Sequence, residues 1–240
     1  MSGHSKWSKV KHQKAVTDVA RAGAFTKASR AITVAVRNGG GQTDPQFNFR
    51  LRLAIEKARE VNMPKANIER AIDRGGVSGD SIEEVVYEAY GPGASALLIA
   101  TLSDNQKRTV AAVKNTLEHH RGKLATPGSV QFQFVLSGLV VLDSGPVPFD
   151  RLFSLAVDGG ADDVTQSGDA VEIYTSPDRL SALKDSLEKQ GITVDSTRLV
   201  MKPRVMINLN DEDRRNLEVL IDELEKHEDV DTVYTNVPGM

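Results

Sequence analysis

The hydrophobic pattern of this chain changes near residue 81, from one long helical period to a succession of short strands and helices. Before that point apolar residues recur three and four positions apart, which places them on one face of an α-helix. After it, short runs rich in β-branched residues alternate with amphipathic stretches of helical length. A chain with this order cannot form one bundle or one sheet. We therefore expect an α+β protein with a separate helical N-terminal part.

The first third of the chain predicts three helices joined by short connections. The stripe of the first helix consists of Phe25, Ala28, Ile32, Ala35 and Val36. Glycines at 39–41 should end this helix, because glycine adopts the left-handed cap conformation without strain. We expect the second helix to begin with Asp44 as N-cap and Pro45 in its first turn, and to bury Phe47. The third helix follows Pro64, so the three together predict a small helical domain.

Residues 132–203 read as strand, helix, two strands, helix and strand, which is the ferredoxin-like order. Gly138 is expected at a turn within the first β region. Residues 205–240 add a helix and a strand, and these can complete the sheet that begins at 81–130. One α/β domain is then inserted into another. The predicted domains are a basic helical domain, an α/β domain in two segments and an inserted ferredoxin-like domain, with boundaries at 1–77, 78–130 plus 205–240, and 131–204.

The amino-acid composition indicates the cellular compartment in which we expect this protein to act. The chain has 240 residues and no cysteine. Disulfides and cysteine-ligated metal sites are therefore excluded, which fits a reducing cytoplasm, where we expect the protein to act. No apolar run approaches the ~20 residues of a membrane-spanning helix. We accordingly predict no membrane partner.

The charges of the chain are strongly segregated along the sequence. Residues 1–75 contain 15 Lys and Arg against 6 Asp and Glu, a net charge of +9. Residues 76–240 contain 15 Lys and Arg against 27 Asp and Glu, a net charge of −12. This split predicts that the first third attracts phosphate-rich polymers, whereas the remainder repels them.

The first fifteen residues, MSGHSKWSKVKHQKA, are basic and contain the only tryptophan of the chain. Such a tail can simply be solvated, but an aromatic ring among lysines also suits a surface that offers phosphates and stacking faces. On the first predicted helix, three cations lie opposite the apolar stripe. The candidate nucleic-acid contacts of these two segments are Lys6, Trp7, Lys9, Lys11, His12, Lys14, Lys27, Arg30 and Arg37.

Catalytic and metal-binding patterns are absent from the sequence. No phosphate loop, nucleophile elbow or H-E-x-x-H motif occurs. His119 and His120 are adjacent, hence about 100° apart on a helix, and cannot both reach one metal from one face. We predict no active site, metal or cofactor. Phe132 and Phe134 alternate with glutamines, and we interpret them as core residues rather than as RNA-stacking aromatics.

Five segments occur in an order that resembles the YebC family, whose relatives include the mitochondrial translational activator of cytochrome oxidase. They are SGHSKWSKVKHQKA, NMPKANIERAI, YGPGASALLI, SDNQKRT and GSVQFQF. The resemblance covers essentially the whole chain. It implies three domains, one inserted into another, and a role in gene expression without catalysis. DNA-linked transcriptional regulation is the usual assignment of members, and translation at the ribosome is the other.

The family match also implies particular residues. At the N-terminus it falls on Gly3, His4, Ser5, Lys6, Trp7, Lys11 and Lys14. A functional loop is implied at Tyr90, Gly91, Pro92 and Gly93. Ala89 and Ala94 stand where the family pattern leads us to expect glycine. In SDNQKRT, Gln106 replaces an expected arginine, whereas Lys107 and Arg108 keep positive charge and join the candidate nucleic-acid contacts.

Together these features predict a cytoplasmic, non-enzymatic regulator of gene expression that binds nucleic acid through residues 1–75. The cations are spread over an arm and three helices, which favours contacts to the sugar–phosphate backbone over base readout. The residues do not separate DNA from ribosomal RNA. The resemblance favours a DNA-binding transcriptional regulator, with a ribosome-binding translation factor as the alternative. A small-molecule-binding regulatory module, by analogy with ferredoxin-like folds, is an alternative of another class. The oligomeric state is open, with a monomer favoured.

Overall fold

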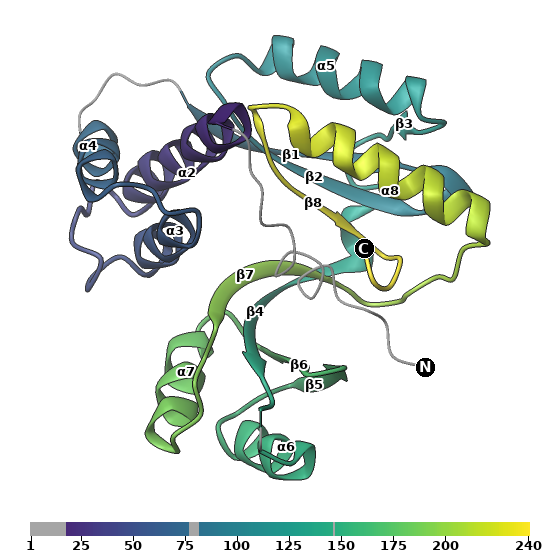
Figure 1. Ribbon diagram of the computed structural model, residues 1–240. Helices are drawn as coiled ribbons and strands as arrows, with labels where there is room; N and C mark the ends of the chain where they lie inside the picture. Colours follow the sequence, from purple (N-terminus) through teal and green to yellow (C-terminus); the bar gives the residue numbers. More distant parts are fainter. Residues whose placement is uncertain (1–17, 77–81, 146) are drawn as a thin grey trace. The chain divides into compact units, whose positions relative to one another are not determined.

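The computed structural model describes residues 18–76, 82–145 and 147–240 (Figure 1). These residues form two compact units. One contains the described residues up to 132 together with 208–235, and the other contains 133–207 together with 236–240. Helices and two four-stranded sheets of antiparallel pairs make this an α+β protein, as the sequence predicts. Within the described ranges, no helix is both long enough and apolar enough to cross a bilayer.

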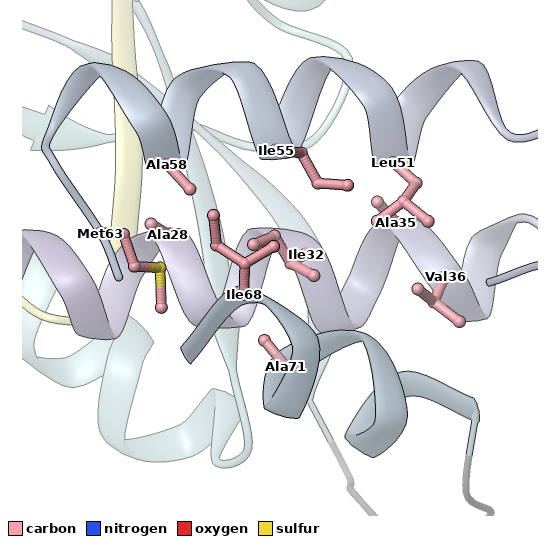
Figure 2. Packing of buried hydrophobic residues seen from close by; sticks show 10 residues of the cluster. All are labelled: Ala28, Ile32, Ala35, Val36, Leu51, Ile55, Ala58, Met63, Ile68 and Ala71. Atoms are coloured by element: carbon pink, nitrogen blue, oxygen red, sulfur yellow. The ribbon is translucent and has the colours of Figure 1, made fainter. Parts of the chain in front are cut away.

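Three helices open the first unit, in the order the sequence predicts: α2 (Asp18–Asn38), α3 (Phe49–Glu60) and α4 (Lys65–Gly76). Figure 2 shows Ile32 of α2, Ile55 of α3 and Ile68 of α4 pointing into one shared core. The Thr33 hydroxyl donates to the Ala71 carbonyl oxygen at 3.1 Å, which satisfies a polar group inside this core. At Gly75 a Cβ would lie 2.7 Å from both the Thr33 carbonyl oxygen and the Val36 Cβ, so α2 and α4 approach closely here because Gly75 has no side chain.

The start of α3 differs from the sequence prediction. Its N-cap is Asn48, whose side-chain oxygen accepts from the Leu51 amide at 3.0 Å. The Asn48 amide nitrogen also donates to the Ala35 carbonyl oxygen at 2.9 Å, which an aspartate could not do. Asp44 instead closes a turn by accepting from the Gln46 amide at 2.8 Å. Phe47 lies before the helix and is 76% exposed, so its assignment to the core was wrong.

The first sheet has the strand order β3-β1-β2-β8. Its strands are β1 (Glu83–Tyr90), β2 (Ala96–Ser103), β3 (Lys123–Leu124) and β8 (Val230–Thr235). A short 3-10 turn, η1 (Pro92–Ala94), joins β1 to β2, and the helices α5 (Gln106–His119) and α8 (Asp211–Lys226) pack with the sheet. Because β8 pairs with β2, the C-terminal part of the chain completes this sheet, as expected. The helix α2 contacts both β2 and β8.

The second unit has the ferredoxin-like topology predicted from the order of its elements. They are β4 (Phe134–Asp143), α6 (Phe149–Asp158), β5 (Asp163–Ser167), β6 (Ala170–Thr175), α7 (Leu180–Lys189) and β7 (Ser196–Pro203). The strand order is β5-β6-β4-β7, and every neighbouring pair is antiparallel. The insertion of one α/β fold into another therefore follows from the path of the chain. The predicted boundaries of functional domains stay a prediction.

Two local expectations in this region were wrong. Gly138 does not lie at a turn, because β4 runs through it without interruption. A Cβ at Gly138 would lie 2.8 Å from the Cβ of Leu180, so the glycine allows α7 to approach the strand. Phe132 belongs to a second 3-10 turn, η2 (Gln131–Gln133), and is 67% exposed, whereas Phe134 is buried.

Candidate nucleic-acid interface

The predicted N-terminal arm lies outside the described residues. Lys6, Trp7, Lys9, Lys11, His12 and Lys14 all precede residue 18. Their proposed contacts therefore stay predictions. The structure places the remaining candidates, which are on α2 and α5, and it adds cations of α3 and α4 that the sequence analysis did not single out.

The three candidate cations of α2, Lys27, Arg30 and Arg37, donate to groups of the α/β part of the first unit. Arg30 Nη1 donates to an Asp229 carboxylate oxygen at 2.7 Å and to the Glu228 carbonyl oxygen at 2.8 Å. Arg37 Nη1 donates to the Ile82 carbonyl oxygen at 2.8 Å. The Lys27 ammonium donates to the backbone of Glu225. The face of α2 opposite the helical core is therefore occupied by the protein itself.

Asp229 brings together two candidates that the sequence suggested separately. Arg108, in the first turn of α5, donates through Nη2 to the Asp229 carboxylate at 3.1 Å, and Arg30 binds the same carboxylate. Thr109 Oγ1 donates to it at 2.7 Å, and Ser103 Oγ does so at 3.2 Å. A recess of about 310 Å³ lies beside this cluster.

The protonation of Asp229 follows from these contacts. Burial by itself raises the pKa of the carboxyl group, because it disfavours the charged form. Hydrogen bonds from Thr109 and Arg108 and the positive charges of Arg30 and Arg108 outweigh this effect, and the pKa is lowered. Asp229 is therefore an anion at neutral pH that ties α2 and α5 to the edge of β8. Lys107, next to Arg108, is exposed and makes no ion pair with a described residue.

A second set of cations lies on α3 and α4. Lys57 Nζ binds an Asp231 carboxylate oxygen at 2.7 Å, and Arg50 Nη1 lies 3.7 Å from a Glu84 carboxylate oxygen. Four other cations of these two helices form a group that we call the outer cations: Arg52, Arg59, Lys65 and Arg70.

The outer cations make only local contacts within the described residues. The Arg52 guanidinium lies 5.4 Å from the Phe49 ring centroid, and Arg70 donates within its own helix. Lys65 is 3.6 Å from Glu69 one helical turn away. Arg59 is exposed and forms no ion pair with a described residue. The sequence signal that could have found them is their position off the apolar stripes of the second and third helices.

The turn from Tyr90 to Ala94 is closely packed. The Gly91 amide donates to the Ser95 carbonyl oxygen at 2.8 Å. Gly93 has a φ of 63°, and a Cβ there would lie 2.5 Å from Leu209 Cδ2. Ala94 has a φ of 58°, in the region that favours glycine, so the alanine at this position carries backbone strain. The candidate loop is thus held against the start of α8.

A recess of about 550 Å³ adjoins this turn. Arg121, Lys123 and Asp213 line it together with residues 90–94. The Lys123 ammonium lies 5.7 Å from the Tyr90 ring centroid, and Arg121 pairs with Glu212 at 3.1 Å. Cations and carboxylates are therefore mixed here, and no group of His, Asp or Glu able to hold a metal ion occurs among the described residues.

Two family models match this chain. The TACO1/YebC N-terminal domain matches residues 5–77, and the TACO1/YebC second and third domain matches residues 82–237. A protein of Methylacidiphilum infernorum is 42% identical over 239 residues, which cover 98% of this chain and 95% of that protein. A protein of Persephonella marina is 44% identical over 240 residues, with coverage of 98% and 95%. Both are named "Probable transcriptional regulatory protein".

A solved structure has the same fold. The crystal structure of a conserved hypothetical protein from Aquifex aeolicus superposes with a TM-score of 0.86 at 36% sequence identity. The superposition covers 97% of this chain and 96% of that one. Matches of this extent at both the sequence and the structural level show that the chain belongs to the TACO1/YebC family.

Proposed function

We propose that this protein is a nucleic-acid-binding regulator of gene expression and that residues 1–77 form its binding domain. The observation that carries the proposal is the charge split, with a net charge of +9 over residues 1–75 and −12 over the rest. The names of the relatives from Methylacidiphilum infernorum and Persephonella marina support a regulatory role. The acidic remainder would orient the molecule by repulsion from a phosphate surface.

The outer cations are our choice for the primary contacts, together with the arm. Arg30 and Arg108 are engaged with Asp229, so they are less available to phosphates than the sequence analysis expected. Arg59, Lys65 and Arg70 are exposed and carry at most local partners among the described residues. They come from two helices rather than one, which favours contacts to the nucleic-acid backbone over the reading of base edges.

Duplex DNA is the proposed target, because the relatives are named for transcription. Cations that recognise a phosphate backbone bind structured RNA as well. The binding assay below therefore uses both polymers at equal length. Tighter binding of RNA would move the proposal from transcription to translation and leave the binding face unchanged.

The test measures binding of the full chain to labelled duplex DNA and to structured RNA over a range of salt concentrations. Arg59→Ala/Arg70→Ala should bind more weakly. The slope of log K against log salt should become less negative by about 1.8, because two phosphate contacts are lost. The matched control is Lys114→Ala/Lys189→Ala, which removes two exposed positive charges from α5 and α7. An equal loss in the control, or no binding by the unmodified chain, contradicts the proposal.

A further inference from the structure

Acidic side chains gather at one end of the first sheet, opposite the cations of α2 and α3. Glu84 of β1 is the partner of Leu102 of β2 in the strand register, and the Leu102 amide donates to the Asp229 carbonyl oxygen at 2.8 Å. Glu84 and Asp229 therefore lie on either side of Leu102 at the same end of the sheet. Asp231 follows two residues later. We call Glu84, Glu228, Asp229 and Asp231 the acidic ridge.

The described cations that form ion pairs with the acidic ridge belong to α2, α3 and α5. Arg30 binds Asp229 at 2.7 Å, Lys57 binds Asp231 at 2.7 Å, and Arg50 lies 3.7 Å from Glu84. The Asn38 side chain donates to the same Glu84 carboxylate at 3.2 Å. Carboxylate and phosphate oxygens bind guanidinium and ammonium groups in the same way. The carboxylates of the acidic ridge thus bind these cations in the way that the phosphates of a nucleic-acid backbone would.

The pairs along the acidic ridge differ in how easily a phosphate could replace the carboxylate. The side chains of Arg30 and Asp229 are only 17% and 11% exposed, and Asp229 is held by three further side chains. Lys57 and Asp231 are 37% and 22% exposed, and Arg50 and Glu84 are 51% and 43% exposed. Partly exposed ion pairs contribute little to stability, so exchange of their partners costs little.

We propose that the acidic ridge is an internal competitor for nucleic acid, in which Asp231 and Glu84 occupy Lys57 and Arg50 and so keep these two cations from phosphates. This inference rests on the proposed function, and it adds a second, self-occupied set of contacts to the outer cations. The Arg30–Asp229 pair stays closed and keeps the helical part attached. The competition limits affinity and makes it depend on charges outside the binding domain.

The test compares two variants of the full chain that lose the same charge. Glu84→Gln/Asp231→Asn removes two carboxylates from the acidic ridge, whereas Glu118→Gln/Asp222→Asn removes two exposed carboxylates from α5 and α8. Binding to labelled duplex DNA is measured at several salt concentrations. The ridge variant should bind more tightly, and its slope of log K against log salt should steepen by about 1.8, because two cations gain phosphate partners. The control should keep the slope of the unmodified chain.

A third variant locates the effect. Adding Arg50→Ala and Lys57→Ala to the ridge variant should return the slope to that of the unmodified chain. Thermal unfolding checks that each variant folds, and Asp231→Asn alone replaces the double change if the latter does not. If the unmodified chain binds and the ridge variant has the same slope of log K against log salt, this inference is overturned and the proposed function is unaffected. A lack of binding by every variant overturns the proposed function, and this inference with it.

Discussion

Glu88 shows how one residue can organise a loop far from it in the sequence. Its buried carboxylate accepts from the backbone amides of Gly128, Val130 and Gln131 at 2.5, 2.5 and 2.9 Å. Burial raises the pKa of Glu88, but the three backbone hydrogen bonds outweigh burial and lower it. The charged form is therefore the one that holds residues 128–131 in place beside β1.

Replacing this carboxylate should destabilise the fold in a pH-dependent way. We expect Glu88→Gln to lower the free energy of unfolding by about 1–3 kcal/mol near neutral pH, because one amide oxygen cannot satisfy all three backbone donors, of which the Val130 amide is buried. A lowered pKa contributes stability that is complete above the ordinary value of about 4.3 and is lost as pH falls through the folded value. Urea unfolding should therefore show the gap between the two proteins closing in acid. The control is Glu188→Gln, on the exposed face of α7. This variant should have the same free energy of unfolding as the unmodified chain at every pH.

At the scale of elements, glycines at helix contacts set how closely the elements pack. Gly138 in β4 faces Leu180 of α7, and Gly75 of α4 faces Thr33 and Val36 of α2. Neither position needs a left-handed backbone, since no positive φ occurs at either. The close approach of the neighbouring element is the reason for glycine in both cases.

A methyl group at Gly138 should therefore be costly. We expect Gly138→Ala to lower the free energy of unfolding by about 1–3 kcal/mol, because its Cβ would lie 2.8 Å from that of Leu180. Gly23→Ala is the opposite case, since nothing lies within 4 Å of its added Cβ and the residue is in α2. That change should stabilise the protein by about 0.5–1 kcal/mol. Destabilisation by both changes to the same extent in denaturant unfolding would contradict the packing argument.

At the scale of the whole molecule, several described cations bind groups of elements that are far away in the sequence. The helical part is attached to the α/β part of the first unit through Arg30, Arg37 and Lys57. A residue selected from sequence as a nucleic-acid contact can thus be a structural one. Arg30 is the clearest case, because its partner Asp229 also holds Arg108.

We expect Arg30→Ala to destabilise the protein by about 2 kcal/mol, the usual cost of losing hydrogen bonds to a charged group that stays partly buried. Combining it with Asp229→Ala should cost less than the sum of the two single changes, since both remove the same pair. Thermal and urea unfolding of the four proteins of this cycle measure the coupling. Additive effects would show that the pair contributes nothing to the attachment of α2.

Much of this fold was already determined by the sequence alone. The stripe from Ala28 to Val36 placed α2 in a core, and the order of elements over residues 132–203 predicted the ferredoxin-like topology. These features depend on local periodicity and on chain order, which are properties of the sequence itself. The segregation of charge and the family motifs were equally visible, and they led to the family that the comparisons show.

Only the tertiary structure decided which cations are available to bind phosphate and which glycines lie where two elements approach closely. Asp229 lies 199 residues after Arg30 and 121 after Arg108, and no local pattern announces that all three meet. The same holds for Asn48, which caps α3 and also donates to a carbonyl oxygen of α2. It holds as well for Gly138, where the close approach of Leu180 leaves no room for a side chain. In each case the energy comes from a partner that is distant in sequence. Periodicity describes a residue's own element, whereas ion pairs, caps shared between helices and close approaches depend on where the chain returns.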